Sequence, residues 1–286
     1  MSEVLAAIEL GGTKTVVALG DARGAILEEH RFPTTTPEET LDVALDWWRE
    51  RASFQRLGIA SFGPIRLDRR REDFGTFLTT PKRAWQQFSL VRYFQDRLPG
   101  VSIALDTDVQ AALLAEMDRG AARGMSDALY LTVGTGIGAG LCCGGALVHG
   151  TLHPEMGHLL VRRHPEDDFA GVCPYHGDCW EGLASGPAIA QRWGKPAQLL
   201  PTDHAAWDMQ AWYLAQGLYA ACAMLSPQCL ILGGGVSQAE GLHAKVATML
   251  DACSAGYFED LGARLVAPAL GQQAGIIGAL LLAAND

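Results

Sequence analysis

Apolar runs that suit β-strands alternate along this chain with stretches of helical periodicity. Residues 4–19 hold two such runs around the turn sequence GGTK (residues 11–14), which predicts a β-hairpin. The same arrangement recurs over residues 128–142, around GTGIG (residues 134–138). Because each hairpin opens about half of the chain, the pattern indicates a weak internal duplication, with two related lobes that face one cleft.

The rest of the pattern predicts an α/β architecture, because strands and helices alternate. The other predicted strands cover residues 56–60, 102–105 and 229–232, and the predicted helices cover residues 41–52, 109–119, 208–225 and 274–284, with one more from Pro187 and another after residue 235. We expect an N-terminal lobe of residues 1–108, completed by the last helix at about 274–286. The C-terminal lobe would then be residues 109–273.

Composition and charge exclude some classes of protein. The chain has 286 residues, 49% of them hydrophobic, which is enough for a substantial core. Its formal net charge of −10 disfavours nucleic acid and anionic membranes as partners. The first residues reach Gly11 too soon for a secretory signal, and no stretch approaches a membrane-spanning length, so we expect a cytoplasmic protein.

The glycine loops are candidates for binding an anion. Glycine lets backbone N–H groups approach a ligand closely, and adjacent N–H groups form a concavity that suits phosphate. Thr13, Lys14 and Thr135 would add hydroxyl and ammonium donors. The plain alternative is that the glycines only make tight turns. A third loop, GGG at residues 233–235, favours a nucleotide site instead.

Two known phosphate signatures do not apply to these loops. A Walker A motif is ruled out because Thr13 separates Gly12 from Lys14. Residues 134–139 match a dinucleotide-binding pattern, but strand and loop follow them rather than the helix that this mode of binding needs. Any phosphate site here is therefore of a different kind.

A pair of carboxylates stands at a predicted strand-to-helix junction, in the segment DTD (residues 106–108). Thr107 and Gln110 have the spacing of a capping box, which would place Asp108 in the first helical turn, where the helix dipole favours an ionised carboxylate. Such a group can take the proton of a hydroxyl during phosphoryl transfer. The alternative is that Asp108 only complements the helix dipole.

The segment CPYHGDC (residues 173–179) brings together Cys173, His176 and Cys179. Their spacing lets a short loop wrap one tetrahedral Zn²⁺ ion, whose fourth ligand must come from elsewhere. The candidates for that ligand are His149, His153, His158 and His164. A disulfide between the two cysteines is the first alternative, which a cytoplasmic location disfavours, and a chance cluster of thiols is the second.

Seven segments, in their order along the chain, carry a resemblance: ELGGTKT, SFGP, DTDVQAA, VGTGIGAGL, HPEMGH, CPYHGDCWEG and LILGGGVS. Together they resemble the ROK sugar-kinase family, most of all its bacterial fructokinase branch, from about Ile8 to Gly278. The resemblance implies a two-lobed actin-like ATPase (ribonuclease H-like) fold with a cleft between duplicated lobes. It also implies ATP and Mg²⁺ in the cleft, a structural Zn²⁺, phosphorylation of a hexose hydroxyl and a homodimer.

The resemblance assigns roles to residues, with Asp108 as the catalytic base. The residues assigned to the sugar are Gly63, Pro64, Thr107, Glu155, His158 and Glu181. Those assigned to the nucleotide are Glu9, Gly11, Gly12, Thr13, Lys14, Thr135, Gly136, Gly138, Pro187, Gly233, Gly234 and Gly235. The zinc ligands would be His158, Cys173, His176 and Cys179, with His164 as runner-up to His158. This chain departs from many relatives at Glu9, where they have aspartate, and at Thr107 and Gln110, where they have asparagine.

We therefore expect an ATP-dependent hexose kinase acting on O6 of fructose, with mannose or glucose as the alternative. A sugar-responsive regulator of the family would need a helix-turn-helix ahead of the first hairpin, which begins by residue 8. An ATPase without a sugar substrate is disfavoured by Asp108, Glu155 and His158. Zinc would lock the sugar-binding groups in place, so chelation should abolish sugar binding while leaving the nucleotide site comparatively intact.

Overall fold

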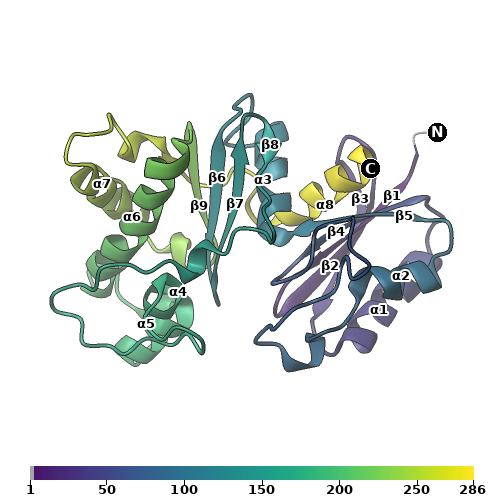
Figure 1. Ribbon diagram of the computed structural model, residues 1–286, viewed down its shortest axis with the longest axis horizontal. Coiled ribbons are helices and arrows are strands. Elements are labelled where there is room, and N and C mark those ends of the chain that lie inside the picture. Colours follow the sequence, from purple (N-terminus) through teal and green to yellow (C-terminus); the bar gives the residue numbers. More distant parts are fainter. Residues whose placement is uncertain (1–2) are drawn as a thin grey trace. The chain divides into compact units, whose positions relative to one another are not determined.

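The computed structural model describes residues 3–286, and the chain forms two compact units (Figure 1). The first unit comprises the chain up to Ala115, Val148–His153 and Gln272–Asp286, and the second comprises Glu116–Leu147 and Pro154–Gly271. The C-terminal helix α8 (Ala274–Asn285) therefore packs in the first unit. The short return of residues 148–153 to the first unit was not anticipated from the sequence.

The first unit is built on a five-stranded sheet of order β3-β2-β1-β4-β5. Its strands are β1 (Leu5–Leu10), β2 (Lys14–Gly20), β3 (Ile26–Pro33), β4 (Arg56–Ser61) and β5 (Ser102–Thr107). The strands β1, β2 and β3 are antiparallel, whereas β1, β4 and β5 are parallel. Alternate residues of β1 enter different cores, because Ile8 packs with α1 (Pro37–Arg49) and α2 (Leu90–Arg97), and Ala7 packs with α8.

The second unit repeats this plan with a sheet of order β10-β9-β6-β7-β8. Its strands are β6 (Ala128–Val133), β7 (Ile137–Cys143), β8 (Ala146–Leu147), β9 (Cys229–Gly233) and β10 (Leu265–Val266). The remaining helices are α3 (Asp108–Arg119), α4 (Trp180–Ala184), α5 (Gly186–Trp193), α6 (Ala206–Leu225) and α7 (Leu242–Ser254).

The two sheets have equivalent strand order. In each, an antiparallel hairpin, β1–β2 or β6–β7, gains a third antiparallel strand on one side and two parallel strands on the other. This equivalence supports the internal duplication that the two glycine hairpins indicated. The α/β architecture predicted from the alternation of strands and helices is confirmed.

Some elements differ from the sequence prediction. Helix α1 begins at Pro37 rather than at residue 41, because extended Thr36 precedes it and proline suits a first helical turn. Strand β3 was not predicted, since most of its side chains are exposed at the sheet edge and show no apolar alternation. Within residues 3–286, no helix combines the length and apolar character needed to cross a membrane.

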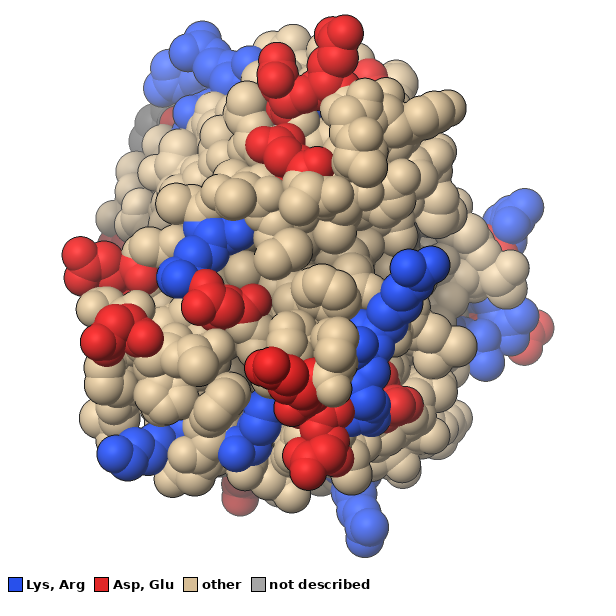
Figure 2. Space-filling model, turned by 90° about the vertical axis from the view of Figure 1, so that its left-hand side faces the viewer, with Lys and Arg blue, Asp and Glu red and all other residues tan. Residues whose placement is uncertain are grey.

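The charged side chains are mixed in sign. Figure 2 shows basic and acidic residues interspersed on one face, separated by a larger area of uncharged residues. On this face there is no extended basic surface of the kind that attracts nucleic acid. This agrees with the net charge of −10 of the whole chain.

Candidate functional site

The first glycine loop connects β1 to β2, and a threonine clamp (Thr15 and Thr34) holds its shape. The Gly11 N–H donates to the Lys14 carbonyl (3.0 Å), and the buried Thr34 hydroxyl donates to the Gly11 carbonyl (2.8 Å). The hydroxyl oxygens of Thr34 and buried Thr15 lie 2.8 Å apart. Residues 12–14 at the tip are exposed. The loop therefore presents its tip, including Lys14, to solvent.

Glu9 lies on β1 just before this loop. Burial raises its pKa above the usual value, and the positive charges of Lys14 and Arg31 offset part of the rise. Among the described residues, the buried Oε2 atom of Glu9 has no hydrogen-bond partner. A buried acceptor without a partner is uncommon, and it suits a position that receives a polar ligand.

The second glycine loop connects β6 to β7 and is held from outside its own sheet. The Gly186 N–H, at the start of α5, donates to the Gly134 carbonyl (2.8 Å). The Ile137 N–H donates to Glu181 Oε2, which belongs to α4 (2.9 Å). A Cβ at Gly136 would lie 2.6 Å from the same oxygen, so a side chain there would force the Glu181 carboxylate to move. Strand β7 follows the loop, so the objection to a dinucleotide motif is confirmed.

The third glycine loop, residues 233–235, begins beside the second. Strand β9 ends at Gly233, which pairs with Thr132 near the end of β6. Pro187 lies in the first turn of α5, where the Ala188 N–H donates to the Ser185 hydroxyl (3.4 Å). The second loop, the third loop and the start of α5 therefore gather in one region of the second unit.

Asp108 opens α3 directly after β5, and Thr107 caps the helix. The Thr107 hydroxyl accepts from the Gln110 N–H (3.2 Å) as expected, but the reciprocal bond of a capping box was a wrong prediction. The Thr107 N–H donates to Asp106 Oδ1 instead (2.8 Å), and Gln110 Nε2 donates to the Val148 carbonyl (3.0 Å). Asp108 Oδ1 accepts the N–H of the next residue (2.9 Å), and both this bond and the helix dipole favour the ionised carboxylate.

The return segment (residues 148–153) contacts two predicted parts of the site in the first unit. His149 Nε2 lies 2.9 Å from the buried Asp106 carboxylate, next to the start of α3. His153 Nε2 accepts from the Ile65 N–H (3.2 Å), directly after the cis Gly63–Pro64 peptide. From the sequence both histidines were candidates only for the metal. The one sequence signal for the His149 contact was Asp106, the carboxylate of the DTD segment that had no assigned role.

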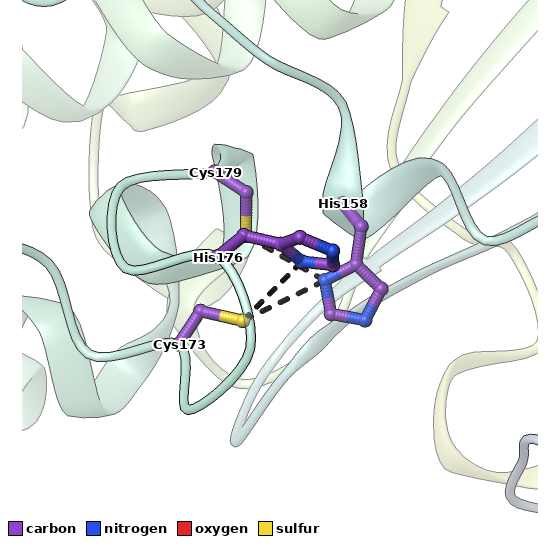
Figure 3. A group of neighbouring side chains, drawn as sticks. All are labelled: His158, Cys173, His176 and Cys179. Carbon is purple, nitrogen blue, oxygen red and sulfur yellow. Dashed lines mark hydrogen bonds between the residues drawn. The ribbon is translucent and has the colours of Figure 1, made fainter.

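Four side chains of the second unit converge in a cysteine–histidine cluster: His158, Cys173, His176 and Cys179 (Figure 3). Their ligand atoms all lie within 4.8 Å of one another. Cys173 Sγ lies 3.8 Å from His158 Nδ1 and 3.7 Å from His176 Nδ1, and Cys179 Sγ lies 3.5 Å from His158 Nδ1. With bonds of about 2.3 Å to sulfur and about 2.0 Å to nitrogen, tetrahedral zinc sets these donors about 3.5 Å apart. The four donors therefore fit Zn²⁺.

The local structure explains how a short segment forms this cluster. Cys173 and Gly177 exchange two backbone hydrogen bonds (3.1 and 3.0 Å), which makes a tight turn, and Cys179 occupies the N-cap of α4. His158 comes from a separate 3-10 helix, Met156–His158. Both cysteines are free thiols rather than a disulfide. His164 lies outside the cluster, where its Nδ1 accepts a backbone N–H two residues on (3.2 Å).

Two carboxylates assigned to the sugar accompany the cluster. Burial raises the pKa of Glu155 to about 7, and the negative charge of Glu181 adds to the rise. Glu155 directly precedes the 3-10 helix that carries His158, and Glu181 follows Cys179 by two residues. A partly protonated carboxyl group near neutral pH can both donate and accept hydrogen bonds, which suits a group that binds sugar hydroxyls.

The assigned residues fall in both units. The first unit holds Glu9, Gly11, Gly12, Thr13, Lys14, Gly63, Pro64, Thr107 and Asp108. The second unit holds Thr135, Gly136, Gly138, Glu155, His158, Cys173, His176, Cys179, Glu181, Pro187, Gly233, Gly234 and Gly235.

Comparison with known proteins identifies the family. The model of the ROK family matches residues 5–286, and the chain therefore belongs to that family. A putative fructokinase of Bacillus subtilis is 41% identical over 286 residues, covering 98% of this chain and 95% of the relative. A fructokinase of Zymomonas mobilis is 43% identical over 291 residues, covering 98% of this chain and 96% of the relative.

Solved structures support the fold. The ROK hexokinase from Thermus thermophilus has a TM-score of 0.77 to this chain at 27% identity, covering 98% of this chain and 97% of that one. The resemblance to ROK sugar kinases and the two-lobed actin-like fold that it implied are thus confirmed.

Proposed function

We propose that the protein is an ATP-dependent hexose kinase that transfers the γ-phosphoryl group of ATP to O6 of D-fructose. The observation that carries the proposal is the identity of 41% and 43%, over nearly the full chain, to a putative fructokinase and a fructokinase. A glucokinase of Streptomyces coelicolor is more distant, at 27% identity. Fructose is therefore the first substrate to test, with glucose and mannose behind it.

In this reaction Asp108 acts as the general base. Its position at the start of α3 favours the ionised form, which can take the proton of the attacking hydroxyl. The hydroxyl oxygen bonds to the γ-phosphorus as the bond to the bridging oxygen breaks, and ADP leaves with that oxygen. Thr107, Gly63 and Pro64 would contact the sugar, and so would Glu155, His158 and Glu181.

The glycine loops hold the nucleotide in this proposal. The first loop, with Thr13 and Lys14, would bind the β- and γ-phosphates, and the second loop would also bind phosphate. Residues 233–235 and Pro187 would lie against the adenosine. Glu9 would help to hold Mg²⁺ through water, and bound Mg²⁺ neutralises charge on the transferring phosphoryl group.

The cysteine–histidine cluster holds a structural Zn²⁺ in this proposal. Two thiolates and two imidazoles complete a tetrahedral set, so no ligand position is left for water or substrate. His158 and its fellow ligands would hold the ion, and ligation would fix their orientation, because a ligand ring cannot rotate away from its metal. His158 and its neighbour Glu155 gain the rigidity that positioning a sugar requires.

The decisive experiment measures ADP release with ATP and Mg²⁺ against fructose, mannose, glucose and N-acetylated hexoses. Asp108→Asn should lower kcat by about 10² to 10⁴ with fructose, since the base is lost while the shape is kept. Asp118→Asn, on the exposed end of the same helix, is the matched control and should behave as wild type. If no sugar stimulates ADP release from zinc-loaded protein, the kinase proposal is wrong.

Three finer expectations belong to the same proposal. A cytoplasmic location is supported by the seven free cysteines, which suit a reducing compartment. The net charge of −10 supports the absence of a nucleic-acid partner. A homodimer is expected from the family resemblance alone, and light scattering after size exclusion would test it.

A further inference from the structure

We propose that the metal-binding cluster positions the second glycine loop as well as the sugar-binding residues, with Glu181 as the positioning residue. The inference rests on the proposed function, in which that loop binds the phosphates of ATP. It revises an expectation drawn from the sequence, because removing zinc should then weaken nucleotide binding too. Two sets of contacts lead from the cluster to the loop.

The first route runs through α4. Cys179 is the N-cap of α4, and Glu181 is the second residue of that helix. Gly182 packs so closely on the metal-binding turn that a Cβ there would lie 1.9 Å from the Gly177 carbonyl oxygen. The Val172 N–H also donates to the Gly182 carbonyl (2.9 Å). The turn and the start of α4 therefore form one packed piece, so metal ligation fixes the backbone that carries Glu181.

Glu181 links α4 to the second glycine loop. Its Oε2 atom accepts the Ile137 N–H at 2.9 Å, and the bond is charge-assisted because the acceptor is a carboxylate. The same atom occupies the space that a side chain on Gly136 would need. Beyond the end of α4, the N–H of Gly186, the first residue of α5, donates to the Gly134 carbonyl (2.8 Å). The segment from Glu181 to Gly186 therefore holds the loop at both of its ends.

The second route runs through His158. This ligand follows Gly157, which packs directly on β7, because a Cβ at Gly157 would lie 2.2 Å from the Ile137 carbonyl oxygen. Ile137 is therefore held on both sides. Its carbonyl packs against the 3-10 helix that carries the ligand His158. Its N–H donates to Glu181, which lies two residues after the ligand Cys179. A metal ion that joins His158 to Cys179 closes a ring around Ile137. The Trp180 N–H also donates to the Leu159 carbonyl (2.8 Å), so one backbone hydrogen bond already joins the two halves, and the ion would add a second link between them.

The test measures binding of AMPPNP with Mg²⁺ by isothermal titration calorimetry, in the absence of sugar. The full chain is compared with zinc bound and after zinc removal, once the chelator has been dialysed away and Mg²⁺ restored. The variants are Glu181→Ala and Glu181→Gln. The matched control is Asp178→Asn, because Asp178 is an exposed carboxylate of the same turn that pairs with Arg163 (2.8 Å). Circular dichroism and zinc content report on fold and loading.

We expect zinc removal to weaken AMPPNP binding about tenfold in wild type and in the control, the amount that loss of one charge-assisted hydrogen bond gives. Zinc-loaded Glu181→Ala should show a similar loss, and zinc removal should add little to it, because both changes act through one contact. Glu181→Gln should keep most of the affinity, since its amide oxygen can still accept from Ile137.

Two results would overturn the proposal: unchanged AMPPNP affinity in folded zinc-free protein, or losses from zinc removal and Glu181→Ala that simply add. If the zinc-free protein unfolds, the zinc-loaded Glu181→Ala variant alone tests the proposal. Wild-type AMPPNP affinity in that variant would also overturn it. Failure of the proposed function looks different. In that case zinc-loaded protein binds AMPPNP with the expected coupling but releases no ADP in response to any sugar.

Discussion

In the first unit the glycine loop is held by its own sheet, whereas in the second it is held by α4 and the start of α5, next to the cysteine–histidine cluster. The clamp of the first loop, Thr15 and Thr34, comes from strand β2 and the residue after β3. The second loop depends on Glu181, 44 positions away from Ile137, and on Gly186. Equivalent strand order thus coexists with different means of support.

The comparison shows that the two copies of a duplicated backbone motif can be held by different surrounding contacts. A hairpin needs only glycine and strand pairing to form, so either unit can make it. Holding its tip still enough for a ligand needs additional contacts, and each unit supplies these from what lies nearby. Only the second loop is held by a residue, Glu181, that lies two positions from a member of the cysteine–histidine cluster. Four predictions separate the two forms of support, starting with the largest effect.

Loss of the metal should have the largest effect and should act on the second unit. Cys173→Ser removes one ligand, and we expect Tm to fall by about 10 °C, because metal-binding free energy contributes directly to folding. Scanning calorimetry and zinc content measure the outcome. Cys253→Ser is the matched control, since that half-buried thiol lies outside the cluster. Equal Tm and equal zinc content in the two variants would contradict a structural metal site.

Loss of the threonine clamp should act on the first loop, and its effect should not depend on zinc. Thr34→Val leaves the Gly11 carbonyl and the buried Thr15 hydroxyl without a partner, at a cost of about 2 kcal/mol in the free energy of unfolding. Urea unfolding measures that cost, and AMPPNP binding should weaken equally with and without zinc. Thr34→Ser keeps the hydroxyl and should restore most of both. A zinc-dependent effect of Thr34→Val would mean that the two loops share one support.

The sequence predicted those features that depend on short-range patterns. The hairpins, the approximate positions of the core strands and the spacing of Cys173, His176 and Cys179 are local, so periodicity and residue type sufficed. His158 was selected as the fourth ligand by family resemblance, and the structure places it in the cluster.

The contacts that give the site its order could not be predicted in this way. The bond from Ile137 to Glu181 joins distant segments, and nothing in either segment alone specifies it. The capping box failed for a related reason, because Asp106 competes for the Thr107 N–H and the return segment offers Gln110 another acceptor. Such choices are made by tertiary packing, which a linear pattern does not contain.

A smaller effect should distinguish two glycines of the second loop. Gly136→Ala places a methyl group 2.6 Å from Glu181 Oε2, so the carboxylate must move away from Ile137. We expect a loss of about 1 kcal/mol in stability without any ligand present. Gly134→Ala meets nothing within 4 Å and is the matched control. Urea unfolding of both variants gives the comparison, and equal stabilities would show that Glu181 does not restrict this loop.

The smallest effect concerns the acid beside each loop and depends on pH. Glu181 has a backbone N–H partner, whereas Glu9 has a buried Oε2 without a partner among the described residues. Burial raises the pKa of Glu9, so the folded chain keeps a proton that the unfolded chain has already released. As pH rises from the ordinary value of 4.5 through the raised folded pKa, the folded state therefore loses stability at this position. Lys14 and Arg31 offset part of the burial cost, which keeps the effect small.

Glu9→Gln removes this dependence, because the amide stays neutral at every pH. Its free energy of unfolding should approach that of wild type near pH 5 and exceed it increasingly toward pH 8, as the wild-type carboxyl group loses its proton. Glu181→Gln should bring no such gain, since it weakens a charge-assisted bond that is already made. Urea unfolding of zinc-loaded, nucleotide-free protein at pH 5, 6, 7 and 8 makes the measurement. The difference in the free energy of unfolding between Glu9→Gln and wild type could instead stay constant across this range. Glu9 would then be as well solvated in the folded chain as in the unfolded one, and the first loop would carry no buried acid.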